Sequence, residues 1–594
     1  MKKAVRWAVV GATAMAMSLA VAACGGSSKK SADASGGSSA TGKQGGKLTY
    51  LAAADIDYLD PGQSYYTFGF AVGNAVNRTL YGFLPSDSVK TIPDLAEGPP
   101  EISADNKTVT VKIRKGIKYA PPVNREIKTA DIKYAFERAF SKNVPSGYAG
   151  VYFSSIVGAP AATGTGPIKD ISGITTPDDN TIVFTLKEPK AALVAQALVL
   201  PISTPVPKEY AAPFDAKIPS TYDEQVAFIG PYMVANDAKT GKTIGWARGK
   251  SLKLVRNPNW DKSTDYRPAY LDEITIQEGN NDLATAARRT LSGTATVCCD
   301  SGSPPSEVLG QALKTQKDQI QFVPSGGTRY IALNTKVAPF DNLNVRKAVV
   351  AAMDRNALRL TRGGEILGDI ANGWIPPGIP GFEEAGGLTQ NTDLDFLKSP
   401  TGDPAVARKY MDAAAAEGLP IKNGKWTGGD KILTIATNAD PGKKTAESFQ
   451  GQIEALGFKL NFRIVPQDTL YTKFCGVPAQ KVAICPNVGW FKDFPDPQAM
   501  LDATFNGKNI IPQGNVNWPQ LDVPAIDDAM AKASLLAAGP DRNKAWAAVN
   551  HLIAEQAPAI PWIWDKTALI NSKDVNAVTD SYTTTHSLPF TSLK

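Results

Sequence analysis

The chain has 594 residues, of which 43% are hydrophobic and 20% are charged, a composition typical of a soluble globular protein with more than one domain. Its formal net charge is +6, yet we find no basic run interleaved with aromatic residues, so nucleic-acid binding is not indicated. With two histidines and no nucleophile-elbow or His-Glu-x-x-His motif, the sequence gives little support to a hydrolase.

The N-terminus predicts export. A basic start is followed by an uncharged apolar stretch, and Val21-Ala22-Ala23 then precedes Cys24. This pattern resembles the lipobox of bacterial lipoproteins, in which the cysteine is acylated after cleavage. We therefore expect residues 1–23 to be a signal peptide and Cys24 to be a lipid anchor. An ordinary secretory peptide with a chance cysteine is the alternative.

Residues 24–46 are rich in Gly, Ser, Ala and Lys and contain no aromatic residue, which predicts a disordered tether. From Lys47 onward the apolar spacing alternates between strand and helix periods. The predicted strands cover 47–51, 107–114, 252–255, 271–277, 330–334, 432–437 and 459–464. The predicted helices cover 65–84, a segment N-capped by Thr129, 283–291, 345–360 and 444–456. This mixture predicts α/β lobes.

Two features that suggest chemistry have simpler explanations. Gly241-Lys242-Thr243 looks like the end of a phosphate-binding loop, but Asn236 stands where the first glycine belongs, so a hairpin turn is predicted. His551 lies in a helical pattern and His586 near the C-terminus, and we expect a helix position and a surface position. Neither is expected to be catalytic.

Four cysteines follow Cys24, and they allow three pairings outside the cytoplasm. Cys475 and Cys485 close a short loop, where we favour a disulfide. A bond between the adjacent Cys298 and Cys299 would be strained. Two cross-links between the pairs, or free thiols, are the alternatives for these residues. None of the spacings predicts a zinc site, and no metal or cofactor is expected.

Several segments together carry a family resemblance in their order along the chain. They are Asp94-Leu95-Ala96-Glu97, the strand–turn–helix segment 109–138, Gly230-Pro231-Tyr232 with Arg256-Asn257-Pro258, the segment 333–354, and the Trp-x-x-Asp-aromatic-x-Asp-Pro motif at 490–497. They resemble the family 5 extracellular solute-binding proteins of ABC importers, which include dipeptide-, oligopeptide- and nickel-binding proteins. Residues 119–126 depart from the family's usual aromatic-His-Asp-Gly turn.

The resemblance implies an α/β fold of two lobes, a type II periplasmic-binding-protein (Venus-flytrap) fold with an extra third domain. Lobe I is expected at 47–88, 225–328 and 563–594, the extra domain at 89–224 and lobe II at 329–562. The ligand would lie between the lobes, with the crossovers near residues 330 and 562 as the hinge. Closure would be favoured because the ligand contacts the closed state better.

The same resemblance assigns a ligand role to Asp493, because in peptide-binding members the aspartate of this motif pairs with the ligand's α-ammonium. The alternative is that Asp493 caps a turn before Pro495. Trp490 either lines the pocket or packs in the core of lobe II.

Three further residues are candidates for ligand contact. Tyr66 and Phe68 lie in a region that borders the cleft in relatives, with core packing as the alternative. Arg329, beside the expected hinge, is a candidate partner for a ligand carboxylate, with a surface role as the alternative.

The expected function is therefore the capture of peptides outside the cytoplasm and their delivery to an ABC permease and its ATPase subunits. The protein is expected to be a monomer, anchored to the cell membrane by lipid alone, at the cell surface or in a periplasm. The alternative is the same role for an oligosaccharide, an opine, a metal chelate or a siderophore. A surface hydrolase and a peptide-sensing receptor are further hypotheses.

Overall fold

The computed structural model describes residues 42–53, 56–160, 164–300, 302–438, 441–512 and 514–594. The predicted signal peptide, Cys24 and most of the predicted tether lie outside these residues. Residues 42–594 form one compact unit. No helix in the described part of the chain is both long and apolar enough to cross a membrane.

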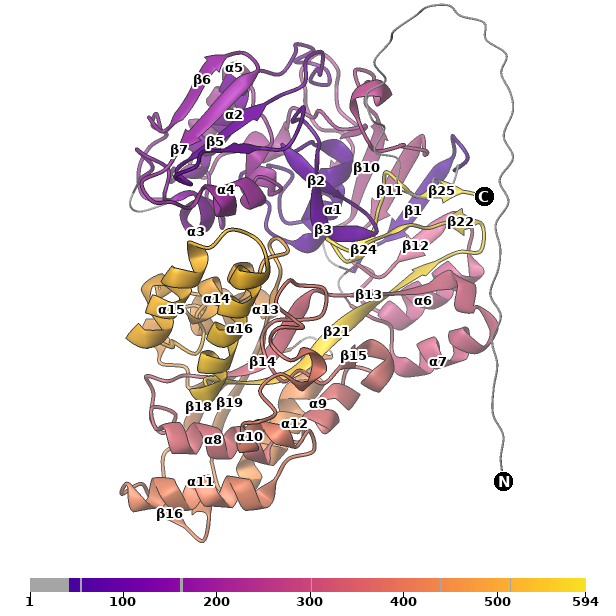
Figure 1. Cartoon of the computed structure of the whole chain (residues 1–594). Coiled ribbons are helices and arrows are strands. Elements are labelled where there is room, and N and C mark those ends of the chain that lie inside the picture. Colours follow the sequence, from indigo (N-terminus) through magenta and orange to yellow (C-terminus); the bar gives the residue numbers. More distant parts are fainter. Residues whose placement is uncertain (1–41, 54–55, 161–163, 301, 439–440, 513) are drawn as a thin grey trace, which may run out of the picture. The chain divides into compact units, whose positions relative to one another are not determined.

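The largest sheet runs through this unit in the order β19-β18-β20-β14-β21-β12-β1-β11-β10-β8, and β13, β15 and β9 pair at its sides (Figure 1). Its strands are β1 (Lys47–Leu51), β8 (Tyr232–Val234), β9 (Trp246–Ala247), β10 (Ser251–Arg256), β11 (Glu273–Gln277), β12 (Thr296–Cys298), β13 (Ile320–Pro324), β14 (Gly327–Leu333), β15 (Gly368–Asp369), β18 (Ile432–Thr437), β19 (Leu460–Val465), β20 (Ile484–Phe491) and β21 (Ala559–Asn571). The 13-residue β21 pairs antiparallel with both β14 and β12, so one strand is shared by the two parts of the sheet.

The unit contains two large hydrophobic cores, and a smaller third cluster includes Ala568 and Ile570 of the shared strand. The first core takes most of its residues from Leu48 to Val297, together with Phe494 and Ala499. The second core takes its residues from Tyr330 to Ile563. The lobe boundaries stay a prediction, but the two cores separate near residue 330, where β14 begins.

A separate four-stranded sheet lies within residues 89–224. Its order is β4-β5-β7-β6, with bounds β4 (Glu101–Ile102), β5 (Thr108–Lys112), β7 (Thr181–Thr185) and β6 (Ile174–Asp178). Helix α2 (Thr129–Ala139) packs on this sheet, and the ring of Phe136 meets that of Phe184 edge-on at 5.2 Å. The short helix α3 (Ala149–Phe153) follows and carries residues toward the candidate site described below.

Helices cover the sheets. Their bounds are α1 (Thr67–Val76), α6 (Leu283–Ser292), α7 (Ser306–Thr315), α8 (Leu343–Ala352), α9 (Arg355–Leu360), α11 (Pro404–Ala416), α12 (Gly442–Ala455), α14 (Pro497–Phe505), α15 (Pro524–Ser534) and α16 (Pro540–Glu555). Strand β18, helix α12 and the parallel strand β19 form the predicted βαβ unit, which is confirmed.

Two helix predictions were wrong in extent. The helix predicted over 65–84 ends at Val76, and the remainder forms strand β2 (Tyr81–Leu84), which pairs with β3 (Asp87–Pro93). The helix predicted over 345–360 is two helices, because Asp354 accepts a hydrogen bond from the backbone N–H of Ala357 at 2.8 Å and begins α9. Pairing with the next strand and a local cap therefore interrupt patterns that are helical in spacing.

The predicted N-cap of α2 was wrong by one residue. Lys128 is the N-cap, and the side chain of Asp131 accepts the Lys128 backbone N–H at 3.0 Å. The Thr129 hydroxyl instead donates to the Asp178 carbonyl at 2.7 Å. The expected position of Asp131 in the first turn is confirmed.

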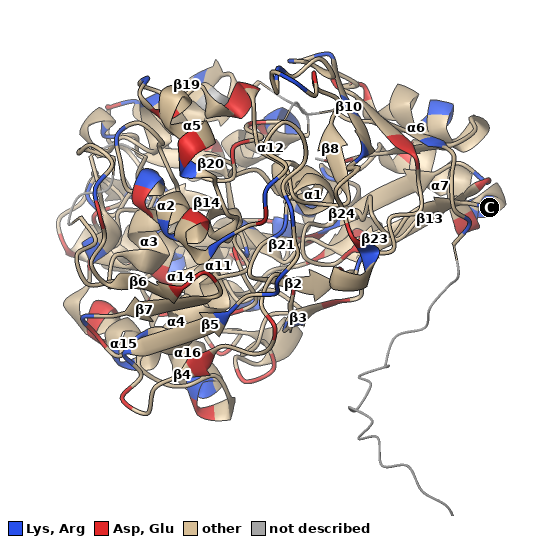
Figure 2. Ribbon diagram, turned by 90° about the horizontal axis from the view of Figure 1, so that it is seen from above, with Lys and Arg blue, Asp and Glu red and all other residues tan. Residues whose placement is uncertain are grey.

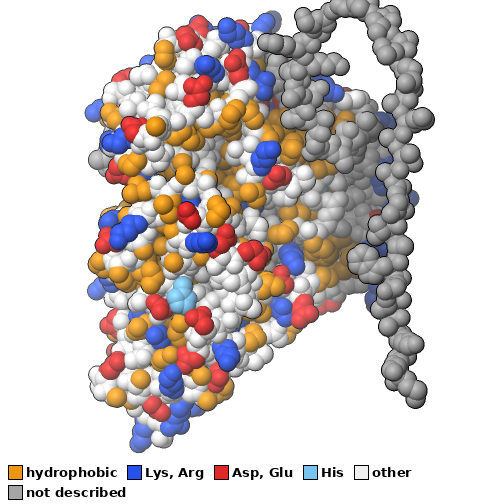
Figure 3. Space-filling model, viewed as in Figure 1, with side chains coloured by type: hydrophobic (Ala, Val, Ile, Leu, Met, Phe, Trp, Pro, Cys, Tyr) orange, Lys and Arg blue, Asp and Glu red, His pale blue; other side chains and the backbone are white. Residues whose placement is uncertain are grey.

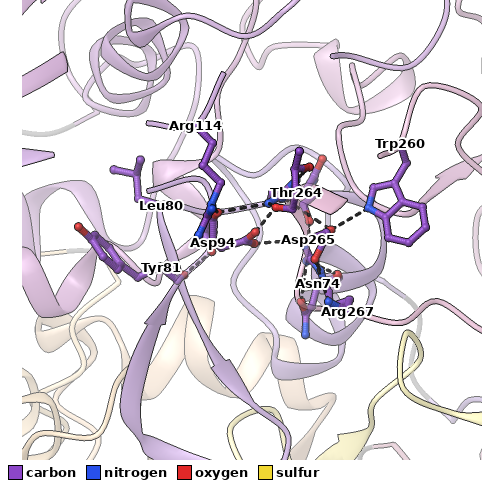
Figure 4. Close-up of polar contacts among 12 residues, drawn as sticks. Asn74, Leu80, Tyr81, Asp94, Arg114, Trp260, Thr264, Asp265 and Arg267 are labelled. Atoms are coloured by element: carbon purple, nitrogen blue, oxygen red, sulfur yellow. Dashed lines mark hydrogen bonds and ion pairs between the residues drawn. The ribbon is translucent and has the colours of Figure 1, made fainter. Parts of the chain in front are cut away.

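Charged residues of both signs are interspersed along the ribbon in Figure 2, and the face seen in Figure 3 has no large area of one sign. Beneath the surface, a buried ionic network joins α1 to the loop after β10 (Figure 4). Arg267 donates to Asp94 at 3.0 Å, to Asp265 at 2.8 Å and to the Asn74 carbonyl at 2.7 Å. Trp260 donates its indole N–H to Asp265 at 2.8 Å.

This network predicts the effect of removing Arg267. Arg267→Met leaves Asp94 and Asp265 buried with less countercharge, so the free energy of unfolding should fall by about 3–5 kcal/mol. Urea unfolding measures it. As a control, Lys112→Met removes an exposed partner of Glu101 and should cost less than about 1 kcal/mol. An equal fall in the free energy of unfolding in both variants would contradict a large stabilisation by the buried network.

Candidate functional site

The loop after β20 contains two aspartates with different surroundings. Asp496 accepts the backbone N–H of Gln498 at 2.8 Å, begins α14, and pairs with Arg542 at 2.8 Å. Asp493, three residues earlier, accepts no backbone N–H among the bonds of the described residues. Asp496 therefore caps α14 and stabilises the turn, whereas the Asp493 carboxylate has no part in building that turn.

The carboxylate of Asp493 lies against tyrosine rather than against a cation. The Tyr152 hydroxyl, from α3, donates to Asp493 Oδ2, and the Tyr582 hydroxyl donates to the Asp493 backbone carbonyl at 2.7 Å. Asp493 is 9% exposed, and no ion pair within the described residues includes it. Burial raises the pKa of Asp493 to about 7, although the Tyr152 hydrogen bond lowers it. A buried carboxylate of this kind is poised to accept a cation.

A series of aromatic rings in contact with one another extends from Asp493 toward α1. The ring of Tyr152 meets that of Phe494 edge-on at 4.9 Å and stacks on that of Tyr148 at 6.2 Å. Tyr148 in turn stacks on Tyr65 at 5.3 Å. Burial, and then the charge of Asp493, raise the pKa of Tyr65 above its usual value, so these hydroxyls stay protonated and able to donate.

Lys492 reaches across the unit from the same loop. Its ammonium donates to the Ser88 hydroxyl and to the Ser581 carbonyl, each at 2.9 Å. Burial lowers the pKa of Lys492 to about 8, while the charge of Asp580 raises it. The loop that carries Asp493 is thus held to β3 and to the segment after β21 by bonds that need no ligand.

Arg329 lies in β14 and belongs to a second charged cluster. Its guanidinium pairs with Asp565 of β21 at 2.5 Å, and Arg362 pairs with the same carboxylate at 3.3 Å. Burial alone would raise the pKa of Asp565, but the two arginines hold it below its usual value. Two cations therefore share one carboxylate beside the strands that join the two cores.

The other predicted site residues lie in two kinds of surroundings. Tyr66 is 50% exposed and stands at the N-terminus of α1. Phe68 packs in the first core, with its ring 5.2 Å from that of Tyr50. Trp490 packs in the second core and donates its indole N–H to the Ala499 carbonyl at 2.7 Å. Ligand contact by Phe68 or Trp490 stays a prediction.

Sequence reasoning did not single out four of the residues that surround the site: Tyr148, Tyr152, Arg362 and Tyr582. The four-residue spacing of the first two tyrosines was a usable signal, since it places them on one helical face. Nothing in the sequence places Tyr582 or Arg362 near the aspartate or the hinge, because those contacts depend on how distant segments pack.

A small hollow of about 70 Å³ lies beside α1, with Phe70, Gly73 and Phe83 among its lining residues. Tyr582 also lines it, but Asp493 does not. Burial and unbalanced charge, rather than this hollow, locate the candidate site at Asp493.

Both cysteine pairs are bonded in the structure. Cys475 is joined to Cys485, and Cys298 to Cys299. His551 lies on α16, as expected from its pattern. The expectation of a surface His586 was wrong, because this residue is fully buried and its Nε2 lies 3.2 Å from the Ile570 carbonyl. Burial lowers the pKa of His586 to about 4.

The raised pKa of Asp493 predicts how stability depends on pH. A carboxylate whose pKa is higher in the folded state stabilises that state fully below about pH 4, and this contribution is lost as the pH rises through about 7. Asp493→Asn should therefore make the ligand-free protein more stable at pH 8, by on the order of 2–4 kcal/mol, with the gain vanishing near pH 4. Urea unfolding of both proteins from pH 4 to pH 8 measures this difference in stability. A difference that does not change with pH would contradict the raised pKa of Asp493.

Comparisons with known proteins agree on one family. The model of the bacterial extracellular solute-binding proteins, family 5 Middle, matches residues 90–511. Di/tripeptide-binding protein 3 of Pseudomonas aeruginosa is 27% identical over 528 residues, covering 86% of this chain and 89% of the relative. Heme-binding protein A of Haemophilus influenzae is 26% identical over 500 residues, covering 82% of each chain.

A solved structure shows the same fold. The clavulanic acid biosynthesis oligopeptide binding protein 2 superposes with a TM-score of 0.78 and 25% identity, covering 93% of this chain and 96% of that one. The expected α/β, type II periplasmic-binding-protein fold is thus confirmed. The family match spans well over half of the sequence, and the chain belongs to the bacterial extracellular solute-binding proteins, family 5.

Proposed function

We propose that this solute-binding protein captures short peptides with a free N-terminus and delivers them to an ABC permease. The observation that carries the proposal is Asp493, a buried carboxylate with no cationic partner among the described residues. A ligand ammonium would supply the missing charge and replace the Tyr152 hydroxyl as its hydrogen-bond donor. The di/tripeptide-binding relative supports peptide as the ligand class.

Proposed lobe II takes in nearly all of the second core, while proposed lobe I and the extra domain share the first core. Lobe I would comprise 47–88, 225–328 and 563–594, lobe II 329–562, and the extra domain 89–224. Asp493 would come from lobe II, and Tyr152 from the extra domain, so a ligand bound to both holds the protein closed. Tyr66 would contact the ligand from lobe I, because it is exposed at the start of α1. Phe68 and Trp490 would support the site from within the cores.

A binding role is favoured over an enzymatic one. Neither histidine forms a hydrogen bond or ion pair with Asp493 among the described residues: the Nε2 of His586 lies near the Ile570 carbonyl, and the Nδ1 of His551 lies near Asn391 Oδ1. The tyrosine hydroxyls beside Asp493 are held protonated by burial, which suits hydrogen bonding to a ligand.

The proposal includes anchoring through Cys24. The sequence before this cysteine supports cleavage and acylation, and the Gly/Ser-rich tether would let the folded part stand away from the membrane. The protein would act as a monomer at the cell surface or in a periplasm, where it meets the permease and its ATPase subunits.

The first test compares free and N-acetylated peptides. Residues 42–594 are unfolded thermally with a pool of three- to six-residue peptides, and with the same pool N-acetylated. Ligand at 100 times its Kd contributes about 2.7 kcal/mol, so the free pool should raise Tm and the acetylated pool should not. Asp493→Asn should abolish this difference, whereas Asp528→Asn, at an exposed position on α15, should keep it.

The outcomes separate the alternatives. Equal shifts with both pools would retain the peptide but remove the ammonium role from Asp493. No shift with either pool, in protein free of carried-over ligand, would contradict peptide capture. Binding of haem, of an opine or of an oligosaccharide would then be measured in the same assay.

Peptide affinity should also depend on pH. Because the pKa of Asp493 lies near 7 without ligand, a proton competes with the ligand's ammonium below that pH. The Kd should rise about tenfold for each pH unit below about 7 and level off above it, until the ligand's own amine (usual pKa about 8) deprotonates. Calorimetry from pH 5 to pH 7.5 measures it. A flat profile in this range would contradict an ionised Asp493 as the anchor.

A further inference from the structure

The Tyr152 hydroxyl holds the place that the proposed function gives to a ligand's ammonium. It donates to Oδ2 of Asp493, and no other hydrogen bond to this carboxylate occurs among the described residues. Both partners are buried, with 5% of Tyr152 and 9% of Asp493 exposed. The bond therefore forms within the protein's own packing, and a ligand group that takes Oδ2 has to break it first.

The packing of α3 directs Tyr152 toward Asp493. Phe153, the next residue, is fully buried, and its ring meets that of Phe136 on α2 edge-on at 5.0 Å. Successive residues of a helix point about 100° apart, so this packing of Phe153 leaves Tyr152 facing another way. The Tyr152 ring meets that of Phe494, the residue after Asp493, edge-on at 4.9 Å. The hydroxyl thus reaches the carboxylate without a ligand to place it there.

The loop that carries Asp493 is also fixed by contacts other than the Tyr152 bond. The Asp493 carbonyl accepts the Tyr582 hydroxyl at 2.7 Å, and two oxygen atoms accept the Lys492 ammonium at 2.9 Å each. Phe494 is fully buried in the first core. Loss of the Tyr152 hydroxyl should therefore leave this loop in position and change only what the carboxylate meets.

A hydroxyl and an ammonium satisfy a buried carboxylate to different degrees. Burial, and then the charge of Asp493, raise the pKa of Tyr152 well above its usual value, so its hydroxyl stays a neutral donor. The hydroxyl supplies a hydrogen bond but no countercharge, and burial still raises the pKa of Asp493 to about 7. A cation would supply both. A neutral N–H donor would only exchange one hydrogen bond for another.

We propose that Tyr152 is a specificity-determining residue, whose hydroxyl competes with the ligand for Asp493. This inference rests on the proposed function and deepens it, because it names the group of the protein that the ligand must displace. The apparent affinity is the intrinsic affinity reduced by the fraction of molecules in which the carboxylate is free of Tyr152. Because every solute that needs Asp493 meets the same reduction, weakly held uncharged solutes are excluded, whereas an ammonium still binds.

The test compares the wild-type protein with Tyr152→Phe, which removes one hydroxyl group. At pH 7.5, calorimetry with trialanine should give a Kd about three- to tenfold lower for the variant, because the competing bond is gone. The N-acetyl derivative, whose amide N–H then meets an unoccupied carboxylate, should bind more tightly as well. The matched control is Tyr410→Phe on α11, which removes a hydroxyl that donates to Asp395 at 2.7 Å and should leave both Kd values unchanged.

The ligand-free protein gives a second readout. Urea unfolding at pH 8 of the single and double variants Tyr152→Phe and Asp493→Asn should show a coupling between the two positions, as expected for directly bonded side chains. Tyr410→Phe should show no coupling with Asp493→Asn. This cycle measures the competing bond without any peptide.

An equal or higher Kd for Tyr152→Phe, in a protein that binds trialanine, would overturn the inference, and so would a coupling of zero. Tyr152→Met, which also lacks the hydroxyl, should shift the Kd in the same direction, and it replaces Tyr152→Phe if that variant does not fold. Trialanine binding by neither the wild-type protein nor the variant would contradict the proposed function itself, and the competition with it.

Discussion

The candidate site depends on one costly arrangement, the burial of the Asp493 carboxylate with no ion-pair partner in the part of the chain that the structure describes. The Tyr152 hydroxyl donates to this carboxylate, and the pKa of Asp493 near 7 reflects the solvent that the carboxylate has lost. A folded protein keeps such a group only where the surrounding packing enforces it. Here that packing is supplied by the Asp496–Arg542 pair and by the Lys492 ammonium, which fix the loop on both sides of Asp493.

Two charged groups of the unit have contrasting surroundings. Asp493 lies among tyrosines, whose hydroxyls stay neutral donors, while Arg329 and Arg362 share the Asp565 carboxylate where β14 and β21 pair. A ligand ammonium would supply the charge that Asp493 lacks among the described residues, so the proposed function depends on the charge of the solute.

Most of the fold could be predicted from the sequence, and the site only in part. Alternating and helical apolar spacing is local, so β1, β5, β10 and the β18–α12–β19 unit were predicted close to their observed bounds. The predictions failed where a pairing partner decides: residues 81–84 form a hairpin with the next strand, β3, and His586 is buried with its Nε2 near the Ile570 carbonyl. Asp493 was found through a family motif, and the spacing of Tyr148 and Tyr152 was a signal that could have been used, whereas Tyr582 and Arg362 reach their positions only through tertiary packing, which no single-sequence pattern records.

The shared strand has a consequence for biogenesis. Strand β21 ends at Asn571, close to the C-terminus, and until it is made β12 and β13 have no antiparallel partner and β14 lacks one of its two neighbours. A chain synthesised from its N-terminus therefore cannot complete either part of the large sheet early. The order of synthesis and the order of strand pairing thus differ, and the large sheet becomes complete only when nearly the whole chain is available.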